Sequence, residues 1–365
     1  MEMKVEKLKA GMTLENDVLG LSGHPIIPKN TVLTSEHIDV LKAFCIQTVE
    51  IKSDDLKKFS TRSKNQSHAS FVRTQALEKK ENEREKFFDL YMKGVASYER
   101  EFNKWKSGLG IDMNTMRKIM IPLIKSIEFH KDRLRRILDY SIKEKYIYHH
   151  AVSVGMISSA IAQNMKLGRG ISIQVGLAGL LADCGMAKIK NVSLIYKPDK
   201  LLNSQYNDIK QHVIYSYNMV KNHNLLRPET KLSILQHHER LDGSGYPMGE
   251  KGKRIHIFSQ IVGISDLFHA MVSERVYKKK QPLFKVLEMI NRDFFGQFDI
   301  QVVNAILDVF AHFSIGTRIK LLDQRTGTVL FVNNIERTRP IIKIEGSNEV
   351  IDLAVKRDLL IDEIL

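Results

Sequence analysis

The spacing of apolar residues changes character several times along the chain. Residues 1–53 alternate short β-type runs (MTLENDVLG, HPIIPKNTVL, QTVEIK) with Gly and Pro turns, and one short helix, SEHIDVLKAF, follows a cap at Thr34 or Ser35. We expect a small α+β module here. Residues 54–67 are polar and lack periodicity, which is typical of a linker.

A helical pattern occupies residues 68–145. Its first stripe has spacings of three and four, which put the residues on one helix face; it consists of Phe88, Tyr91, Val95, Tyr98, Phe102 and Trp105. After the turn SGLG (107–110), a second stripe consists of Met116, Met120, Leu123, Ile127, Leu134 and Ile137. This pattern predicts a helical hairpin whose stripes pack on each other and on the next domain. An intermolecular coiled coil, and with it a homodimer, is the alternative, but the heptads are short.

The remaining pattern is almost entirely helical over residues 146–312 and returns to β-type runs over 313–365. The predicted fold class is therefore mainly α, and 365 residues allow two or three domains with a large core. No uncharged segment reaches the run of about 20 apolar residues that a spanning helix needs. The N-terminus MEMKVEKLK lacks a signal-peptide pattern, so we expect a cytoplasmic protein with no membrane span.

The net charge limits the class of possible partners only slightly, and the cysteine content indicates no disulfide framework. The formal net charge of +14 favours an anionic partner, which includes nucleic acids, nucleotides and membrane surfaces. Cys45 and Cys184 are too few for a disulfide framework and are expected to be small buried hydrophobic residues.

Imidazoles and carboxylates gather in the helical segment that begins at residue 146. They include His149 and His150, His212, the pair His237 and His238, and Asp266. A single histidine on a helix is most often an ordinary core or surface residue, but so many on separate helices favour a metal site. Imidazole and carboxylate ligands suit Zn, Mn or Fe. Neighbouring helical residues point about 100° apart, but at a helix end both members of the His237 and His238 pair can reach one cavity.

Residues 146–312 resemble the HD-GYP family, a branch of the HD metal-dependent phosphohydrolases that hydrolyse the bacterial messenger cyclic di-GMP. The resemblance rests on the segments YIYHHAVSV, LLADCGM, IYKPDKLL, IKQH, HHERLDGSGYP and ISDLFHAMVSERVYK. It implies an all-helical HD-type domain that takes cyclic di-GMP, rather than a nucleic acid polymer, as its partner. The first fifty residues and IGTRIKLLDQRTGTVLFVNN also resemble, more weakly, the module and the small β-rich tail that flank such domains.

The resemblance also implies the roles of individual residues. One metal position would consist of His150, Asp183 and Asp266, and its neighbour of Asp183, His212, His237 and His238. The bridging Asp183 would hold two divalent ions about 3.5–4 Å apart, where they activate water and stabilise an in-line displacement at phosphorus. Glu239 and Asp242 would join Asp183 as catalytic residues by orienting the imidazoles through their other ring nitrogens.

The same family positions imply a substrate-binding set. Tyr246 lies with Gly243, Gly245 and Pro247 in a loop beside the metals, and Arg275 and Lys278 match positions that hold the substrate's phosphates. A solvated basic surface is the alternative for the two cations, because Lys279 and Lys280 follow directly.

Three departures leave the activity open. Ala182 stands where the family has the histidine of its His-Asp pair, Met186 replaces a lysine, and His269 replaces a second aspartate. His269 lies one helical turn from Asp266, so it either completes the first metal position or only hydrogen-bonds behind it. The chain is thus expected to be a cyclic di-GMP phosphodiesterase with one or two Mn, Fe or Zn ions, or alternatively an inactive cyclic di-GMP receptor.

Overall fold

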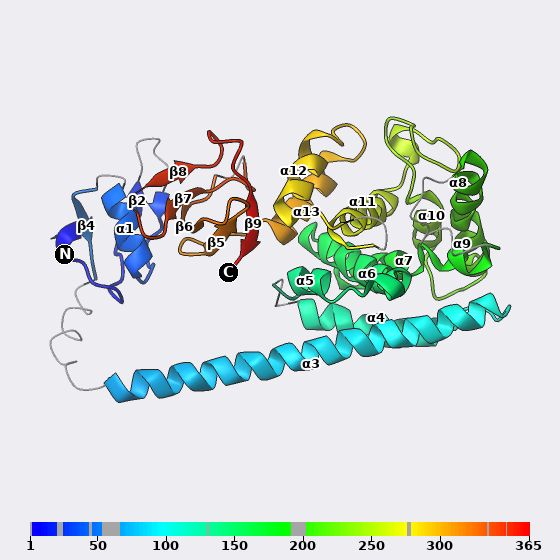
Figure 1. The fold of residues 1–365 in the computed structure, drawn as a ribbon, viewed down its shortest axis with the longest axis horizontal. Coiled ribbons are helices and arrows are strands. Elements are labelled where there is room, and N and C mark those ends of the chain that lie inside the picture. Colours follow the sequence, from blue (N-terminus) through cyan, green and yellow to red (C-terminus); the bar gives the residue numbers. More distant parts are fainter. Residues whose placement is uncertain are drawn as a thin grey trace. The chain divides into compact units, whose positions relative to one another are not determined.

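The computed structural model describes residues 2–19, 25–43, 46–52, 66–128, 130, 132–190, 202–275, 279–333, 336–347 and 349–365. It divides into two compact units (Figure 1): Glu81–His312 forms one, and Met1–Lys80 together with Phe313–Leu365 forms the other. The described chain is mainly α, as predicted. Most of the expected linker lies outside the described residues.

The N-terminal segment is a small α+β arrangement. β1 (Glu2–Lys4) pairs antiparallel with β4 (Thr48–Glu50), β2 (Val18–Leu19) pairs with β3 (Pro25–Ile27), and α1 (Ser35–Ala43) lies between them in sequence. Thr34 is the cap of α1, because its Oγ1 accepts a hydrogen bond from the His37 backbone N–H at 3.3 Å.

The C-terminal segment completes this unit. Its antiparallel sheet has the strand order β8-β7-β6-β5-β9 and consists of β5 (Arg318–Leu321), β6 (Thr326–Phe331), β7 (Ile341–Ile344), β8 (Val350–Asp352) and β9 (Ile361–Ile364). Leu330 of β6 joins the hydrophobic core of the N-terminal segment, and α1 packs on β6. The two ends of the chain therefore share a core.

A buried arginine organises the loop before β9. Arg339 is only 6% exposed, and its guanidinium donates to the backbone carbonyls of Leu353, Arg357 and Leu359 at 2.8, 3.2 and 3.3 Å. We expect Arg339→Met to lower the free energy of unfolding of this unit by about 3 kcal/mol. The variant loses charge-assisted hydrogen bonds and leaves buried backbone carbonyls without a donor. Urea unfolding measures the effect, with Lys356→Met, an exposed cation of the same segment, as the control. Equal stability of the two variants would contradict this role.

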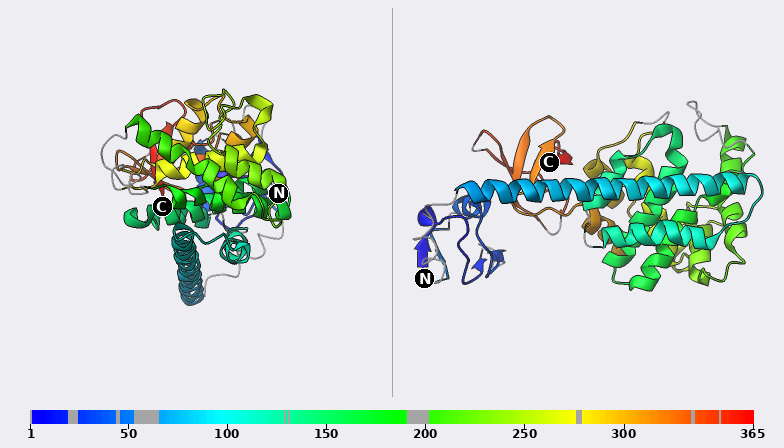
Figure 2. Two further views of the ribbon diagram at one scale, coloured as in Figure 1. Left: turned by 90° about the vertical axis from the view of Figure 1, so that its right-hand side faces the viewer. Right: turned by 90° about the horizontal axis from the view of Figure 1, so that it is seen from below.

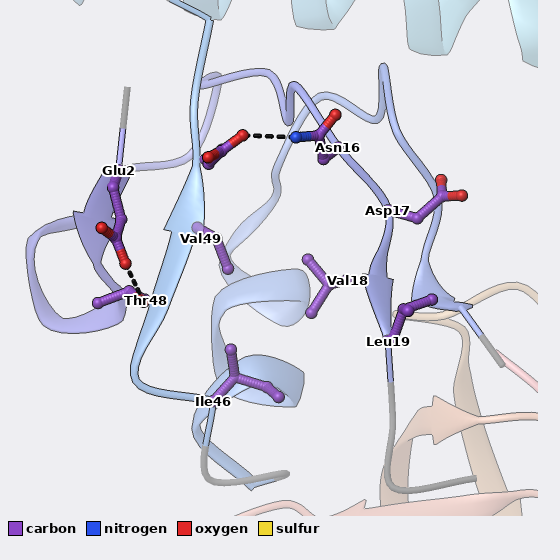
Figure 3. Close-up of a pocket in the computed structure, with 9 residues that line it drawn as sticks. Glu2, Asn16, Asp17, Val18, Leu19, Ile46, Thr48 and Val49 are labelled. Carbon is purple, nitrogen blue, oxygen red and sulfur yellow. Dashed lines mark hydrogen bonds between the residues drawn. The ribbon is translucent and has the colours of Figure 1, made fainter. Parts of the chain in front are cut away.

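A pocket of about 400 Å³ opens between β2 and β4 (Figure 3). Thr48 Oγ1 donates to Glu2 Oε1 at 2.7 Å, and Asn16 Nδ2 donates to Glu50 Oε2 at 2.5 Å. Apolar side chains line the rest of the pocket, including Val18, Ile46 and Val49. These polar groups on the rim are therefore bonded to one another within the module.

The second unit, which begins at Glu81, contains most of the predicted hairpin. α3 (Gln66–Lys106) and α4 (Met113–Ile127) run alongside each other (Figure 2), and Asp112 caps α4 by accepting from the Asn114 N–H at 2.9 Å. The stripe residues are buried as expected, with one exception. Phe87, not Phe88, occupies the buried face; Phe88 is 41% exposed and makes an edge contact with the Tyr140 ring. Because the spacing mixes steps of three and four residues, the sequence pattern placed the start of the stripe at Phe88 instead of Phe87.

The remaining helices of this unit follow the hairpin in sequence. They are α5 (Asp132–Arg136), α6 (Tyr146–Asn164), α7 (Arg169–Leu181), α8 (Asn203–Lys210), α9 (His212–Val220), α10 (Pro228–Gln236), α11 (Ile257–Val272), α12 (Leu283–Arg292) and α13 (Ile300–Phe310). α6 and α7 approach so closely that a Cβ on Gly179 would lie 2.8 Å from the Val154 carbonyl oxygen. One stretch, Arg169–Lys188, has the length and apolarity of a membrane span, but 72% of its apolar window is buried, as in a core helix.

Candidate metal centre

Most of the candidate ligands lie at or near the ends of helices, and these ends meet at one place. His150 lies near the start of α6, Asp183 follows α7, and His212 opens α9. His237 and His238 directly follow α10, whereas Asp266 lies within α11. α6 packs on α7 and α11, and α10 packs on α7, α9 and α11, so these separate segments converge.

One group of donors surrounds Asp183 on the side of α9 and α10. Asp183 Oδ1 lies 3.0 Å from His212 Nε2 and 3.6 Å from His237 Nε2. With His238, these residues each offer a ligand atom within 4.8 Å of the others. The predicted second position is therefore assembled with all of its donors.

A second group shares the same carboxylate. His150 Nε2 lies 2.8 Å from Asp266 Oδ1 and 3.6 Å from Asp183 Oδ2. Asp183 thus turns one oxygen toward each group, which is the arrangement expected of a bridging ligand. Ala182, which precedes it, is buried and offers no donor atom.

The protonation states match a cation site. Burial raises the pKa of Asp183, but the imidazoles of His212, His237 and His150 hold it well below its usual range. Burial also raises the pKa of Asp266, and the hydrogen bond with His150 together with the electrostatic effect of the nearby imidazoles brings it below its usual value. The pKa of His238 is depressed by burial and by His237. Two carboxylates and a neutral imidazole are forms that bind a divalent ion directly.

His212 differs from His238 because its carboxylate partner is closer. Burial lowers the pKa of His212, but the charge of Asp183 and its hydrogen bond raise it above the ordinary value. A cation must therefore displace a proton from this imidazole.

Backbone carbonyls hold two of the imidazoles in position. His212 Nδ1 lies 2.7 Å from the Ile209 carbonyl oxygen, and His237 Nδ1 lies 2.8 Å from that of Ile234. An N–H on Nδ1 that donates to the carbonyl directs each Nε2 toward Asp183, where a cation can bind it once any proton on it is displaced.

Glu239 and Asp242 do not orient these imidazoles, which corrects the expectation for both. The Glu239 carboxylate is buried and accepts the backbone N–H groups of Met248 at 2.7 Å and Glu250 at 3.0 Å. Asp242 is exposed and accepts from the backbone and side chain of Ser244. Glu239 therefore fixes the loop that carries Tyr246, and Asp242 closes a turn within it.

His269 lies behind His150, so the hypothesis that it completes the first metal position is not supported. Its Nδ1 lies 3.0 Å from His150 Nδ1, at the ring edge opposite to the one that faces Asp266. His269 is fully buried, and Ser273 Oγ lies 3.2 Å from its ring nitrogens. Tyr146, which the sequence reading missed, places its hydroxyl 3.0 Å from the same His150 Nδ1. The i, i+4 spacing of Tyr146 and His150 was the available signal.

The loop after Asp183 is held close to α9. A Cβ on Gly185 would lie 2.2 Å from the His212 carbonyl oxygen and 2.4 Å from the Ser216 N, so only glycine permits this approach. Cys184 is fully buried, and its Sγ lies 4.0 Å from the Ser216 carbonyl oxygen. Burial raises the pKa of this thiol, as expected for an inert core cysteine.

The substrate-binding candidates flank the cluster. The Tyr246 ring stacks on His238, with centroids 4.6 Å apart, and burial raises the pKa of its hydroxyl. The Arg275 guanidinium lies 4.8 Å from the centre of the Tyr146 ring, on the side of His150. Lys278 lies outside the described residues.

The cluster is buried on one side and open on the other. The side chains of His212 and His237 are 1% and 0% exposed, whereas those of Asp183, Asp266 and His238 are 15%, 14% and 16% exposed. Buried nitrogens and partly accessible carboxylates fit a divalent ion that keeps open coordination positions. The donor set therefore suits a catalytic ion better than a closed structural one.

The comparisons with known proteins cover this unit. The family model described as "HD domain" matches residues 119–302. A cyclic di-GMP phosphodiesterase of Pseudomonas aeruginosa is 26% identical over 67% of this chain and 58% of its own length. A cyclic di-GMP phosphodiesterase of Thermotoga maritima is 33% identical over 44% of each chain, and a 3'3'-cGAMP-specific phosphodiesterase of Vibrio cholerae is 28% identical over 45% of this chain. The matches span 58%, 44% and 35% of the length of these relatives.

A solved structure extends the likeness in fold. An HDG"Y"P protein from Bdellovibrio bacteriovorus superposes with a TM-score of 0.51 over 86% of this chain and 99% of its own, at 15% identity. At that identity the likeness concerns the fold alone.

Proposed function

The chain belongs to the HD domain family, and we propose that its helical unit is a metal-dependent phosphodiesterase of the HD-GYP type that hydrolyses cyclic di-GMP. The observation that carries the proposal is the carboxylate of Asp183, which belongs to both groups of donor atoms. The names of the Pseudomonas and Thermotoga relatives support this substrate. We propose that this activity is cytoplasmic, because its substrate would be a bacterial second messenger.

The ligands proposed for one or two divalent ions are those of the two donor groups. They are His150, Asp183 and Asp266 on one side, and Asp183, His212, His237 and His238 on the other. Imidazole nitrogens with carboxylate oxygens suit Mn, Fe or Zn. The chemistry that such ions supply when bound is polarisation of a phosphoryl oxygen and acidification of water.

The surrounding side chains would bind and orient the substrate. Tyr246 forms one wall of the open side, and Glu239 keeps that wall in place through the backbone of its loop. On the other side we propose that Arg275, and Lys278 three residues after it in sequence, bind a phosphate; the Arg275 guanidinium already lies over Tyr146 beside His150.

A second candidate function is a cyclic di-GMP receptor without turnover. The observation that favours it is the weakness of the first metal position, which lacks a donor at Ala182 and has only His150, Asp183 and Asp266. Met186 likewise offers no cation. A receptor would bind the messenger with the complete second position and the Tyr246 loop.

An anaerobic assay on the full chain distinguishes the two functions. Purified protein is loaded with Mn, Fe or Zn, its metal content is measured, and cyclic di-GMP and its linear product are followed by chromatography. Metal-dependent formation of the linear dinucleotide is the expected result. Binding of cyclic di-GMP without any product, by protein that carries metal, would instead establish the receptor.

A further inference from the structure

Lys210 is held between two aromatic rings at the open side of the metal centre. It is the last residue of α8, and its Nζ lies 4.6 Å from the centre of the Tyr206 ring and 5.1 Å from that of the Tyr246 ring. Tyr246 in turn stacks on His238 with an interplanar angle of 26°. One aromatic ring therefore separates the ammonium group from a candidate metal ligand.

This contact leaves the ammonium group available to an anion. Within the described residues, no carboxylate lies within ion-pair distance of Lys210. An aromatic face attracts an ammonium ion through its quadrupole but does not cancel the charge as a carboxylate does. The rings therefore restrict the position of Lys210 and leave its N–H groups able to donate to an anion.

Two other cations near the centre, Arg240 and Lys188, donate to backbone carbonyls. The Arg240 guanidinium donates to the carbonyl oxygens of His237 and Glu239 at 3.0 and 2.8 Å. Lys188 Nζ donates to the Trp105 carbonyl oxygen at 2.6 Å. Position 186, where the resemblance implies a lysine, holds a buried methionine. Among the described residues, Lys210 is therefore the cation that we expect to carry the positive charge on the α8 and Tyr246 side of the centre.

We propose that Lys210 is a substrate-binding residue that contacts a phosphodiester group and supplies the charge that Met186 does not. Tyr206 and Tyr246 hold its side chain in the orientation for this contact. The inference rests on the proposed function in that the anion is a cyclic dinucleotide phosphate. Arg275 lies on the His150 side of the centre, so Lys210 and Arg275 would contact the substrate from opposite sides.

Steady-state kinetics of Lys210→Met, Lys210→Arg and the unchanged chain test this contact. We expect Lys210→Met to raise KM for cyclic di-GMP about 10- to 100-fold, the range of one charge-assisted hydrogen bond, with a smaller change in kcat. Lys210→Arg should recover most of the affinity, and metal content should equal that of the unchanged chain in both variants. The matched control is Lys285→Met, which removes an exposed charge from α12, at the other end of the unit from α8 (Figure 1).

The aromatic clamp has its own test. Tyr206 is 49% exposed, so its replacement leaves no buried cavity. Tyr206→Leu removes the ring and should raise KM several-fold, whereas Tyr206→Phe keeps the ring and should retain most of the affinity. Equal KM values for Leu and Phe at this position would overturn the clamp.

The outcomes separate this inference from the proposed function. If the unchanged chain hydrolyses cyclic di-GMP and Lys210→Met has the same KM, the inference is wrong and the function stands. If the unchanged chain is inert, the phosphodiesterase proposal fails, and equilibrium dialysis of cyclic di-GMP against metal-loaded protein decides the role of Lys210. Binding that is about 10-fold weaker in Lys210→Met supports the contact, and equal binding, or none in either protein, overturns it.

Discussion

Asp183→Asn is expected to abolish hydrolysis of cyclic di-GMP and to release metal from both positions. The Asp183 oxygens lie 3.0–3.6 Å from Nε2 of His150, His212 and His237, so a single carboxylate joins the two donor groups. Asparagine keeps the size of the side chain but has no charge and only one acceptor oxygen. We expect the rate to fall by at least about 10³-fold, because both positions lose a ligand and changes to groups behind the ligands alone already cost about 10- to 100-fold.

Metal analysis of the same variant separates loss of ligands from loss of fold. The control is Asp89→Asn, the same chemical change at an exposed position of α3. It should retain the metal content and rate of the unchanged chain. Full metal content in Asp183→Asn, with an unchanged thermal transition, would show that this carboxylate does not bridge the two positions.

The sequence predicted the donors of the metal centre better than the groups behind them. His150, Asp183, His212, His237, His238 and Asp266 were identified from motifs, and the structure brings them together. The partners of His212 and His237 are backbone carbonyls three residues earlier, which no side-chain motif encodes. The family resemblance implied that Glu239 orients the imidazoles, yet its carboxylate binds backbone N–H groups of its own loop.

His269 illustrates the limit of helical spacing. The spacing correctly placed Asp266 and His269 on one face of α11. It did not specify which edge of the His150 ring each side chain would meet, because that depends on the packing of α11 on α6. Asp266 faces Nε2 and His269 faces Nδ1, at 2.8 and 3.0 Å, so one is a candidate ligand and the other supports the ring from behind.

The same limit applies to the fold. Periodicity within α3 and α4 predicted the hairpin, because a helix and its buried stripe are local features of the sequence. The contribution of Leu330 to the core of the N-terminal segment joins residues about three hundred positions apart. No local pattern carries that information, and the two ends of the chain were accordingly predicted as separate segments.

Restoring the missing histidine and lysine is expected to raise activity. Ala182→His with Met186→Lys should increase the rate of cyclic di-GMP hydrolysis about 10- to 100-fold and raise the metal content, because the first position would gain a donor beside His150, Asp183 and Asp266. Both positions are buried, at 3% and 8% exposure. The larger side chains should therefore cost about 1–3 kcal/mol of stability.

Ala182→Phe with Met186→Lys is the matched control, because phenylalanine adds similar bulk without a nitrogen donor. A folded histidine variant with unchanged metal content and rate would show that residue 182 does not reach the centre. The new lysine also connects this prediction to Lys210. If the lysine at position 186 then binds the phosphate, Lys210→Met should raise KM less in the Met186→Lys background than in the unchanged chain. The difference between the two effects measures how strongly both charges interact with the same phosphate.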